Sequence, residues 1–349
     1  MNFLKTFLAS LLGTVVAFVV GFILLFIVIA GIASSVSFED SDAAMIQDKS
    51  ILSLKMDLPI LDNVPGTQDF QVSLGLDAES IKLIDIVTAI ELAKTNDKIK
   101  GIHLRSDNIN AGWSQAKTLR DALSSFKTSG KFISAYSDFF TQMGYYVASV
   151  ADSIFVNPNG GVDFKGLASE VLYFKDFEDK YGFKMEVIRH GKYKSAVEPF
   201  LSNSMSSANR EQISILLNSL WKTIGSEIAE SRNISLETLD VIATNLQANL
   251  VNNAVEVGLI DQITYKIEYE NKLKSHLGLE PSDKLRLVSY KDILAGNAAH
   301  RKGVRDQVAI IYAQGPILFG DGNETQIGDK NFVDAIEKAA KSKRIKAIV

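Results

Sequence analysis

Cysteine is absent from the 349 residues of the chain, which excludes disulfide bonds, thiolate metal ligands and a cysteine nucleophile. Histidine is scarce, and the four residues present lie apart, without the spacing of metal ligands: His103, His190, His276 and His300. A His-Glu-x-x-His motif, a Walker A motif and a dinucleotide-binding glycine pattern are all missing. We therefore predict no metal site and no cofactor.

The chain also has no excess of basic residues: its formal net charge is -4 and its isoelectric point is near 5.7. No tract rich in lysine and arginine is interleaved with aromatic residues. Nucleic-acid binding depends on such a positive surface, so we expect no nucleic-acid partner.

Residues 7–36 contain no charged side chain. About 20 apolar residues cross a bilayer, whereas the apolar region of a signal peptide has about 7–15. Lys5 precedes this stretch, and three acidic residues follow it: Glu39, Asp40 and Asp42. Because lysine favours the cytoplasmic side, we predict a single-pass signal anchor over residues 1–36, with the bulk of the chain outside the cytoplasm. A signal peptide cleaved at Ala33-Ser34-Ser35 is the alternative.

Strand and helix patterns alternate through the first half of the chain. Residues 51–56 alternate as a strand does, and apolar residues then recur at helical spacing: Leu83, Ile86, Val87 and Ile90. Further strands are predicted at 99–104, 132–136 and 154–156, with helices at 114–126 and 140–150 and a turn at 157–161. This alternation predicts an α/β fold with mainly parallel strands.

The pattern changes in the middle of the chain. A strand is predicted at 185–189 and a long helix from about Ala208, followed by helices at 236–246 and 252–257. An apolar stripe continues for about five turns of the long helix, and we expect it to pack in the core or against a subunit: Ile213, Leu216, Leu217, Leu220, Trp221, Ile224 and Ile228.

Between the strand at 185–189 and the long helix lies the run Gly191-Lys192-Tyr193-Lys194-Ser195-Ala196-Val197-Glu198-Pro199-Phe200. By spacing alone Lys194 is a surface lysine next to a turn, as most lysines are solvated. However, residues 193–200 closely resemble the lysine motif of the long, tandem-repeat signal peptide peptidase A (protease IV) family. Residues 144–149 (Gly-Tyr-Tyr-Val-Ala-Ser) and 205–211 are similar to two further parts of that family. The resemblance runs from about Ile51 to the last residue.

This resemblance implies an α/β fold of the Clp protease/crotonase-like type and a serine endopeptidase with a Ser–Lys dyad. Lys194 matches the general base, which acts only as a neutral amine, so that burial has to lower a lysine pKa from about 10.4. Tyr193 and Ser195 are neighbours that could shape this burial. Glu198 is either a counter-charge for the lysine or a solvated carboxylate.

In the family the nucleophilic serine lies in a Gly-Gly-Ser turn after the strand that matches residues 345–349. The resemblance therefore implies a nucleophile beyond residue 349. The first lobe has Ala111-Gly112-Trp113-Ser114 in the equivalent place, without a Pro-Gly-Gly-Ser turn. Ser114 is thus a second candidate nucleophile, against its interpretation as a helix N-cap, a position that serine favours.

The expected partners follow from the same resemblance. They are signal peptides and other apolar peptides, the lipid bilayer through residues 7–36, and further copies of the chain in a homo-oligomer. The expected location is the bacterial inner (cytoplasmic) membrane. The competing hypothesis is a catalytically inactive, membrane-tethered scaffold or binding lobe of the same fold, because a fold does not fix a function.

The sequence also indicates an internal duplication. A shift of 246 residues aligns Val87 with Val333, Ile90 with Ile336 and Ile99 with Ile345, among other identical pairs. We expect five segments: a signal anchor at 1–36, a stalk at 37–50, a first peptidase lobe at 51–275, an inter-lobe linker at 276–306, and the start of a truncated second lobe at 307–349. The basic run 300–305 is interpreted as part of this linker, with a docking site as the alternative. The chain is expected to be an N-terminal fragment that is inactive by itself.

Overall fold

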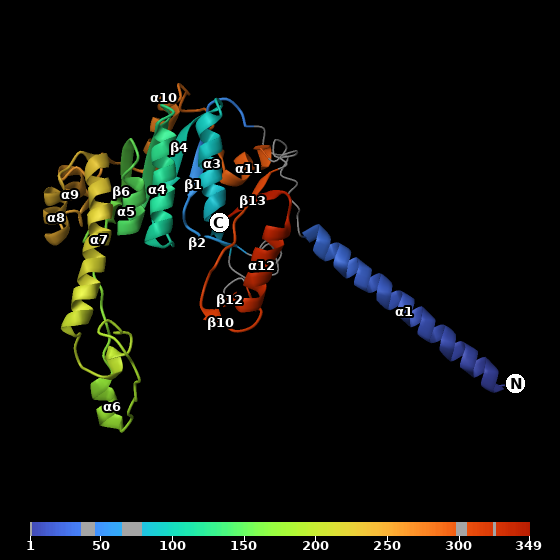
Figure 1. Cartoon of the computed structure of the whole chain (residues 1–349). Helices are drawn as coiled ribbons and strands as arrows, with labels where there is room; N and C mark the ends of the chain where they lie inside the picture. The colour runs from blue at the N-terminus through green and yellow to red at the C-terminus, as the bar shows by residue number, and fades with distance from the viewer. Residues whose placement is uncertain (1, 36–45, 65–78, 298–305, 324–325) are drawn as a thin grey trace. The chain divides into compact units, whose positions relative to one another are not determined.

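The structure is a computed structural model that describes residues 2–35, 46–64, 79–297, 306–323 and 326–349 (Figure 1). The chain divides into two compact units, which we describe separately. The larger unit consists of Gln47–Asp62 and Ile81–Lys291, and the smaller unit contains both ends of the chain. Most of the predicted stalk and the basic run at 300–305 lie outside the described residues.

A six-stranded sheet forms the centre of the larger unit, with the strand order β7-β6-β5-β4-β1-β8. Every neighbouring pair in it is parallel, as the alternating pattern predicts. The strands are β1 (Ser50–Lys55), β4 (Ile99–Arg105), β5 (Phe132–Phe140), β6 (Ser153–Val162), β7 (Gln262–Ile263) and β8 (Arg286–Val288). A short parallel pair lies beside it, β2 (Ile60–Leu61) with β3 (Ile81–Lys82).

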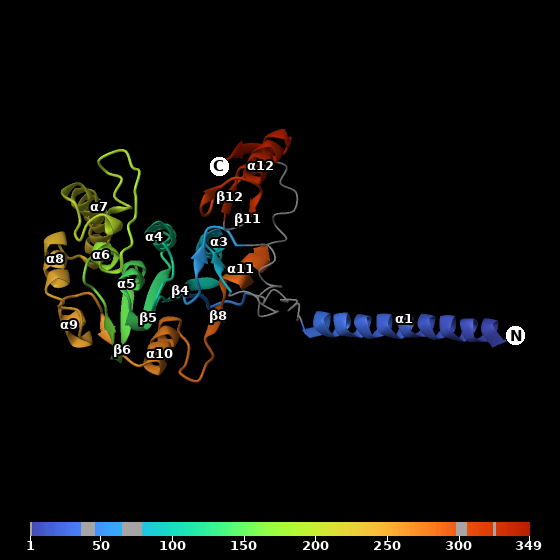
Figure 2. The same ribbon diagram turned by 90° about the horizontal axis from the view of Figure 1, so that it is seen from below.

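Helices cover both faces of this sheet (Figure 2). One face carries α3 (Leu83–Thr95), α4 (Trp113–Lys127) and α5 (Gln142–Ala148), and the other carries α10 (Lys266–His276). Tyr269 and Leu273 of α10 pack against Ile51 of β1 and Tyr136 of β5 in a buried cluster. The remaining short helices are α8 (Leu236–Thr244), α9 (Val251–Glu256) and α11 (Tyr290–Asn297). The predicted α/β fold is confirmed.

Strand β6 is longer than its sequence pattern suggests. The turn predicted at 157–161 is wrong, because β6 continues through these residues to Val162. Gly160 allows this, since a Cβ atom there would lie 1.7 Å from the carbonyl oxygen of Asp138 on β5. The pairing of β5 with β6 shifts register between Ser137 and Phe139, and glycine lets the two backbones approach at that irregularity.

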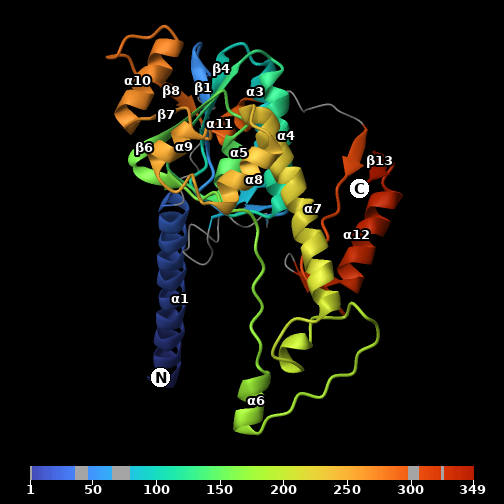
Figure 3. The same ribbon diagram turned by 90° about the vertical axis from the view of Figure 1, so that its left-hand side faces the viewer.

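The strand predicted at 185–189 is also wrong. Residues 183–190 have no regular structure, and among the described residues no strand pairs with them. They belong to an extension that we call the arm, residues 165–206, which contains α6 (Lys175–Tyr181) and the 3₁₀ turn η1 (Glu198–Phe200). Figure 3 shows the arm at the far end of the long helix α7 (Ser207–Arg232). An alternating pattern forms a strand only where a neighbouring strand accepts its hydrogen bonds.

Helix α1 (Asn2–Ser35) of the smaller unit contains a stretch, Lys5–Ile27, that is long and apolar enough to cross a membrane. Its mean hydropathy is 2.7 over 23 residues, which matches the length of a bilayer span. The prediction of an apolar N-terminal helix is confirmed.

The C-terminal part of the smaller unit repeats the start of the larger one. Strand β9 (Gln307–Ala309) pairs in parallel with β13 (Ile345–Ile348), as β1 does with β4, and each pair has a register shift after its first residues. Helix α12 (Asp329–Lys341) occupies the same residues as α3 after a shift of 246. Strand β10 (Ile317–Leu318) pairs in parallel with β12 (Gln326–Gly328), and β11 (Gly322–Asn323) also pairs with β12. The pairing of Ile317 with Ile327 corresponds to that of Ile60 with Ile81 in the larger unit. The repeated register supports the duplication inferred from the sequence.

Candidate active site

Lys194 lies in the loop of residues 191–197, which we call the lysine loop, at the C-terminal side of the arm. Its side chain is exposed, and among the described residues its amine has no hydrogen-bond or ion-pair partner. The backbone around it is fixed, however. Its carbonyl oxygen accepts a hydrogen bond from Nη1 of Arg189 at 2.9 Å, and its N–H donates to the carbonyl of Gly191 at 3.4 Å. Gly191 has a φ of +109°, a conformation that glycine adopts without strain.

Neighbouring side chains do not bury the lysine. The ring of Tyr193 faces Lys192, whose amine lies 4.9 Å from the ring centre and donates to the tyrosine hydroxyl at 3.2 Å. Tyr193 is half exposed. Ser195 contributes its carbonyl oxygen, which accepts a hydrogen bond from the N–H of Glu198 at 2.9 Å. Both residues therefore shape the loop rather than cover Lys194.

Glu198 is neither a counter-charge for Lys194 nor solvated, so both sequence-based interpretations of it are wrong. It is 5% exposed, and its carboxylate accepts hydrogen bonds from the N-terminus of α7. The donors are the backbone N–H and hydroxyl of Ser206 and the side-chain amide of Asn209. The hydrogen bond from the Ser206 hydroxyl is the main cause that lowers the pKa of Glu198. Ser206, a residue type that favours the N-cap, follows Glu198 by eight residues and was the signal in the sequence for this contact. Helix N-termini favour nearby carboxylates.

The second resembling motif, residues 144–149, forms most of α5 and has a structural role. A Cβ atom at Gly144 would lie 2.1 Å from the carbonyl oxygen of Ser106, in the loop after β4. The hydroxyl of Ser106 in turn donates to the carbonyl of Gly144 at 3.1 Å. Tyr145 is buried and donates to the carbonyl of Leu259 at 2.9 Å. The motif therefore holds α5 against the sheet edge, and the sequence alone did not assign it this role.

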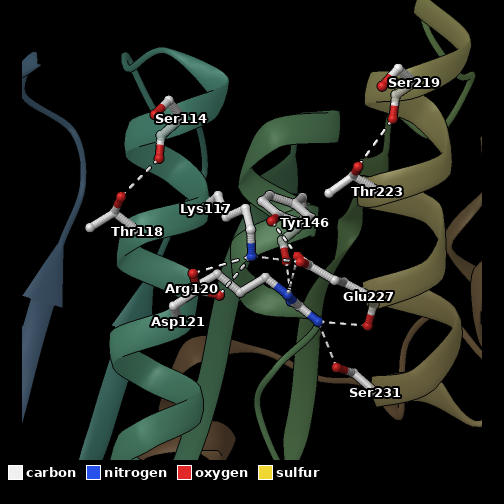
Figure 4. Close-up of polar contacts among 10 residues, drawn as sticks. All are labelled: Ser114, Lys117, Thr118, Arg120, Asp121, Tyr146, Ser219, Thr223, Glu227 and Ser231. Atoms are coloured by element: carbon white, nitrogen blue, oxygen red, sulfur yellow. Dashed lines mark hydrogen bonds and ion pairs between the residues drawn. The ribbon is translucent and has the colours of Figure 1, made fainter.

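Arg120 of α4 connects the same motif to α7 (Figure 4). Its guanidinium is buried and donates to the carbonyl of Tyr146 at 2.5 Å and to the hydroxyl of Ser149 at 2.7 Å. On α7 it donates to the carbonyl of Glu227 at 2.8 Å and to the hydroxyl of Ser231 at 2.5 Å. The carboxylate of Glu227 accepts a further hydrogen bond from the hydroxyl of Tyr146 at 2.5 Å. These contacts fasten the C-terminal half of α7, whose other end carries the arm.

The second candidate nucleophile, Ser114, lies in the first turn of α4 and is exposed (Figure 4). It is not the N-cap, as the sequence suggested, because the N-cap is Gly112, whose N–H donates to the side chain of Gln115 at 2.8 Å. Within the part of the chain that the structure describes, the Ser114 hydroxyl contacts no base. The described residues thus bring no serine to Lys194. They also contain no group of three or more side chains able to hold a metal ion.

Comparison with known proteins gives a consistent result. Residues 125–280, which include Lys194, match the sequence profile of peptidase family S49. The chain is similar to Protease 4 of Haemophilus influenzae, with 30% identity over 330 residues that cover 90% of this chain and 54% of that protein. It is also similar to Protease 4 of Salmonella typhi (32% over 276 residues, covering 76% and 44%) and to the chloroplastic serine protease SPPA of Arabidopsis thaliana (28% over 270 residues, covering 74% and 39%). The chain spans about half the length of the curated relatives it matches.

Proposed function

We propose that the chain, which is similar to Protease 4 of Haemophilus influenzae and whose residues 125–280 match peptidase family S49, is part of a membrane-anchored serine endopeptidase with Lys194 as general base. The observation that carries the proposal is the placement of Lys194. It is exposed in the lysine loop at the C-terminal side of the arm, its carbonyl oxygen accepts a hydrogen bond from Arg189, and it lies within residues 125–280 that match the family. A lysine with a fixed backbone and an exposed amine can accept a proton from a serine that this lobe does not supply.

The reaction needs a nucleophile, a base and an oxyanion hole. The neutral amine of Lys194 removes the proton from a serine hydroxyl as its oxygen attacks the carbonyl carbon of a peptide bond. The resulting ammonium group then donates that proton to the leaving amine as the bond between carbon and nitrogen breaks, leaving an acyl-enzyme. Water releases the acyl group in a second step with the lysine again as base.

The serine and the oxyanion hole lie beyond residue 349 in this proposal. The repeat of the β1/β4 register in β9/β13 supports it, because such a repeat is expected if residues 307–349 begin a second lobe of the same kind. The segments expected at 1–36, 37–50, 51–275 and 276–306 then correspond to anchor, stalk, first lobe and linker. Assembly of the complete site would also remove water from Lys194, and desolvation favours a neutral amine.

Location and partners form the less direct part of the proposal. Helix α1 would anchor the protein as a single pass in the bacterial inner membrane, with the lobes on the extracytoplasmic side. Apolar peptides, and signal peptides in particular, would be the substrates. Exposed apolar side chains on the arm support a homo-oligomer, since patches of this kind mark protein interfaces: Leu172, Phe177, Tyr181, Phe183, Met185 and Ile188.

The test is peptidase activity of the protein together with its C-terminal continuation, wild type against Lys194→Ala, on a fluorogenic apolar peptide. Lys184→Ala is the matched control, because Lys184 is an exposed lysine of the same arm. We expect Lys194→Ala to abolish turnover with an unchanged circular dichroism spectrum, and Lys184→Ala to keep it. Full activity of Lys194→Ala would exclude Lys194 as the base.

The competing function is an inactive scaffold or binding lobe. An inactive wild-type protein that folds and reaches the membrane would favour it. The 349-residue chain by itself is expected to be inactive under either function, and turnover by it that Lys194→Ala abolishes would contradict the placement of the serine.

A further inference from the structure

Glu198 connects the lysine loop to the first turn of α7. The residue lies four positions after Lys194, on the 3₁₀ turn η1, and is 5% exposed. One carboxylate oxygen accepts the N–H of Ser206 at 3.2 Å and the side-chain amide of Asn209 at 3.0 Å. The other accepts the hydroxyl of Ser206, which is the N-cap of α7 and itself accepts the N–H of Asn209 at 3.2 Å.

Such an arrangement fixes the carboxylate in one position. A buried carboxylate is stable only when its oxygens accept hydrogen bonds, and here three donors satisfy them. The positive end of the α7 dipole adds to their effect. Because hydrogen bonds to an ionised group are stronger than neutral ones, the turn η1 cannot leave α7 without a large loss of free energy.

The main chain of Glu198 connects this fixed carboxylate to the lysine loop. Its N–H donates to the carbonyl of Ser195, the residue next to Lys194, at 2.9 Å. On the other side, Arg189 holds the carbonyl of Lys194 at 2.9 Å. Helix α7 is fastened to α4 and α5 through Glu227 at its far end. A continuous path of hydrogen bonds and helix therefore leads from the sheet to the backbone of Lys194.

We propose that Glu198 is a positioning residue that holds the lysine loop on the N-terminus of α7 and so sets where the amine of Lys194 meets the serine. This inference rests on the proposed function. It assigns Glu198 no contact with the substrate and no proton transfer. A reaction is slowed strongly when a catalytic group departs from its reactive geometry, so greater mobility of the lysine loop should lower the rate.

The first experiment measures kinetics in the protein with its C-terminal continuation. Glu198→Gln keeps the shape of the side chain but points an amide NH₂ at the donors of Ser206 and Asn209. We expect kcat to fall by about tenfold or more with KM changed less than twofold. Glu198→Ala removes both acceptor oxygens, and we expect it to lower kcat further than Glu198→Gln, again with KM changed less than twofold. Glu230→Gln, an exposed carboxylate on α7, is the control and should keep full kcat.

The second experiment uses hydrogen exchange in the 349-residue chain, where no catalysis is needed. Glu198→Gln should speed the exchange of backbone amides in residues 191–206, whereas Lys194→Ala should leave it unchanged. Unchanged kcat in Glu198→Ala, or a rise in KM as large as the fall in kcat, would overturn the inference. Activity in Lys194→Ala would instead overturn the proposed function, so the two failures are distinguishable.

Discussion

The guanidinium of Arg120 on α4 donates a hydrogen bond to the main-chain carbonyl of Glu227 on α7 at 2.8 Å, and its Nε lies 3.5 Å from the carboxylate of the same residue. The two residues lie 107 positions apart in the sequence. Tyr146 of α5 contacts both residues, since its carbonyl accepts from Arg120 and its hydroxyl donates to Glu227. One buried cation thus joins three helices, and the lysine loop depends on the third of them for its position.

Glu227→Gln should lower the free energy of unfolding of the chain by about 2 kcal/mol, because it leaves the Arg120 guanidinium buried without a counter-charge. The value lies below the 3–5 kcal/mol of a fully buried pair, since the Glu227 side chain is 25% exposed. Urea unfolding of both proteins measures the difference. Asp121→Asn is the control, because Asp121 is an exposed partner of Lys117 and its loss should cost less than about 1 kcal/mol. Equal effects of the two variants would contradict the role given to the buried pair.

Gly144→Ala should destabilise the chain by about 1–3 kcal/mol, the range for overpacking of a close-packed interior. The added Cβ atom would lie 2.1 Å from the carbonyl oxygen of Ser106, and backbone on both sides has to move. The matched change Gly112→Ala meets no atom closer than 3.7 Å, and since alanine is a poorer N-cap than glycine it should cost less than about 1 kcal/mol. Thermal unfolding of the two variants checks the contrast, and equal melting temperatures would show that α5 can shift freely.

Acid should weaken the larger unit through His103 on β4. Burial, and then the charges of Arg105 and Lys266, lower the pKa of His103 from 6.5 to about 4, and its Nδ1 lies 2.7 Å from the hydroxyl of Tyr269. Between these pH values the unfolded chain binds more protons than the folded one, so the free energy of unfolding falls as the pH falls. The full contribution is present above pH 6.5, and about 3 kcal/mol of it is lost by pH 4.

Urea unfolding between pH 4 and pH 8 measures this loss, and His103→Gln provides the comparison. The variant should be less stable than wild type at pH 8 but lose less stability on acidification, because glutamine does not titrate. If both proteins lose stability in parallel, other groups than His103 control the acid response.

Ile188→Glu should leave the stability of the isolated chain unchanged, because the side chain is fully exposed in the arm. In the protein with its C-terminal continuation, the same change should dissociate the proposed homo-oligomer, since a carboxylate in an apolar interface loses its hydration. Analytical ultracentrifugation in detergent measures the assembly. Lys184→Glu on the same arm is the control for charge, and dissociation by both variants alike would point to electrostatic repulsion instead.

Local patterns predicted most elements of the larger unit. The apolar spacing of Leu83 to Ile90 gave α3, and the alternation at 51–56 gave β1, because both depend on the face that each element buries. The predictions from local patterns were wrong where the secondary structure depends on backbone that is distant in the sequence. Gly160 resembles a turn residue, yet it lies in β6 because Asp138 approaches it, and residues 185–189 alternate without a strand to pair with.

The candidate site divides in the same way. The sequence by itself predicted Lys194 as the candidate base through its motif. It also predicted the apolar helix α1 and the repeat that begins at residue 307, since each is a property of residue order. Only the tertiary structure decided the roles of Glu198, Gly144 and Arg120. Their partners lie on other elements, and burial changes the interactions that a polar side chain makes. A carboxylate before a proline is solvated on average, but it becomes an anchor when a helix N-terminus lies against it.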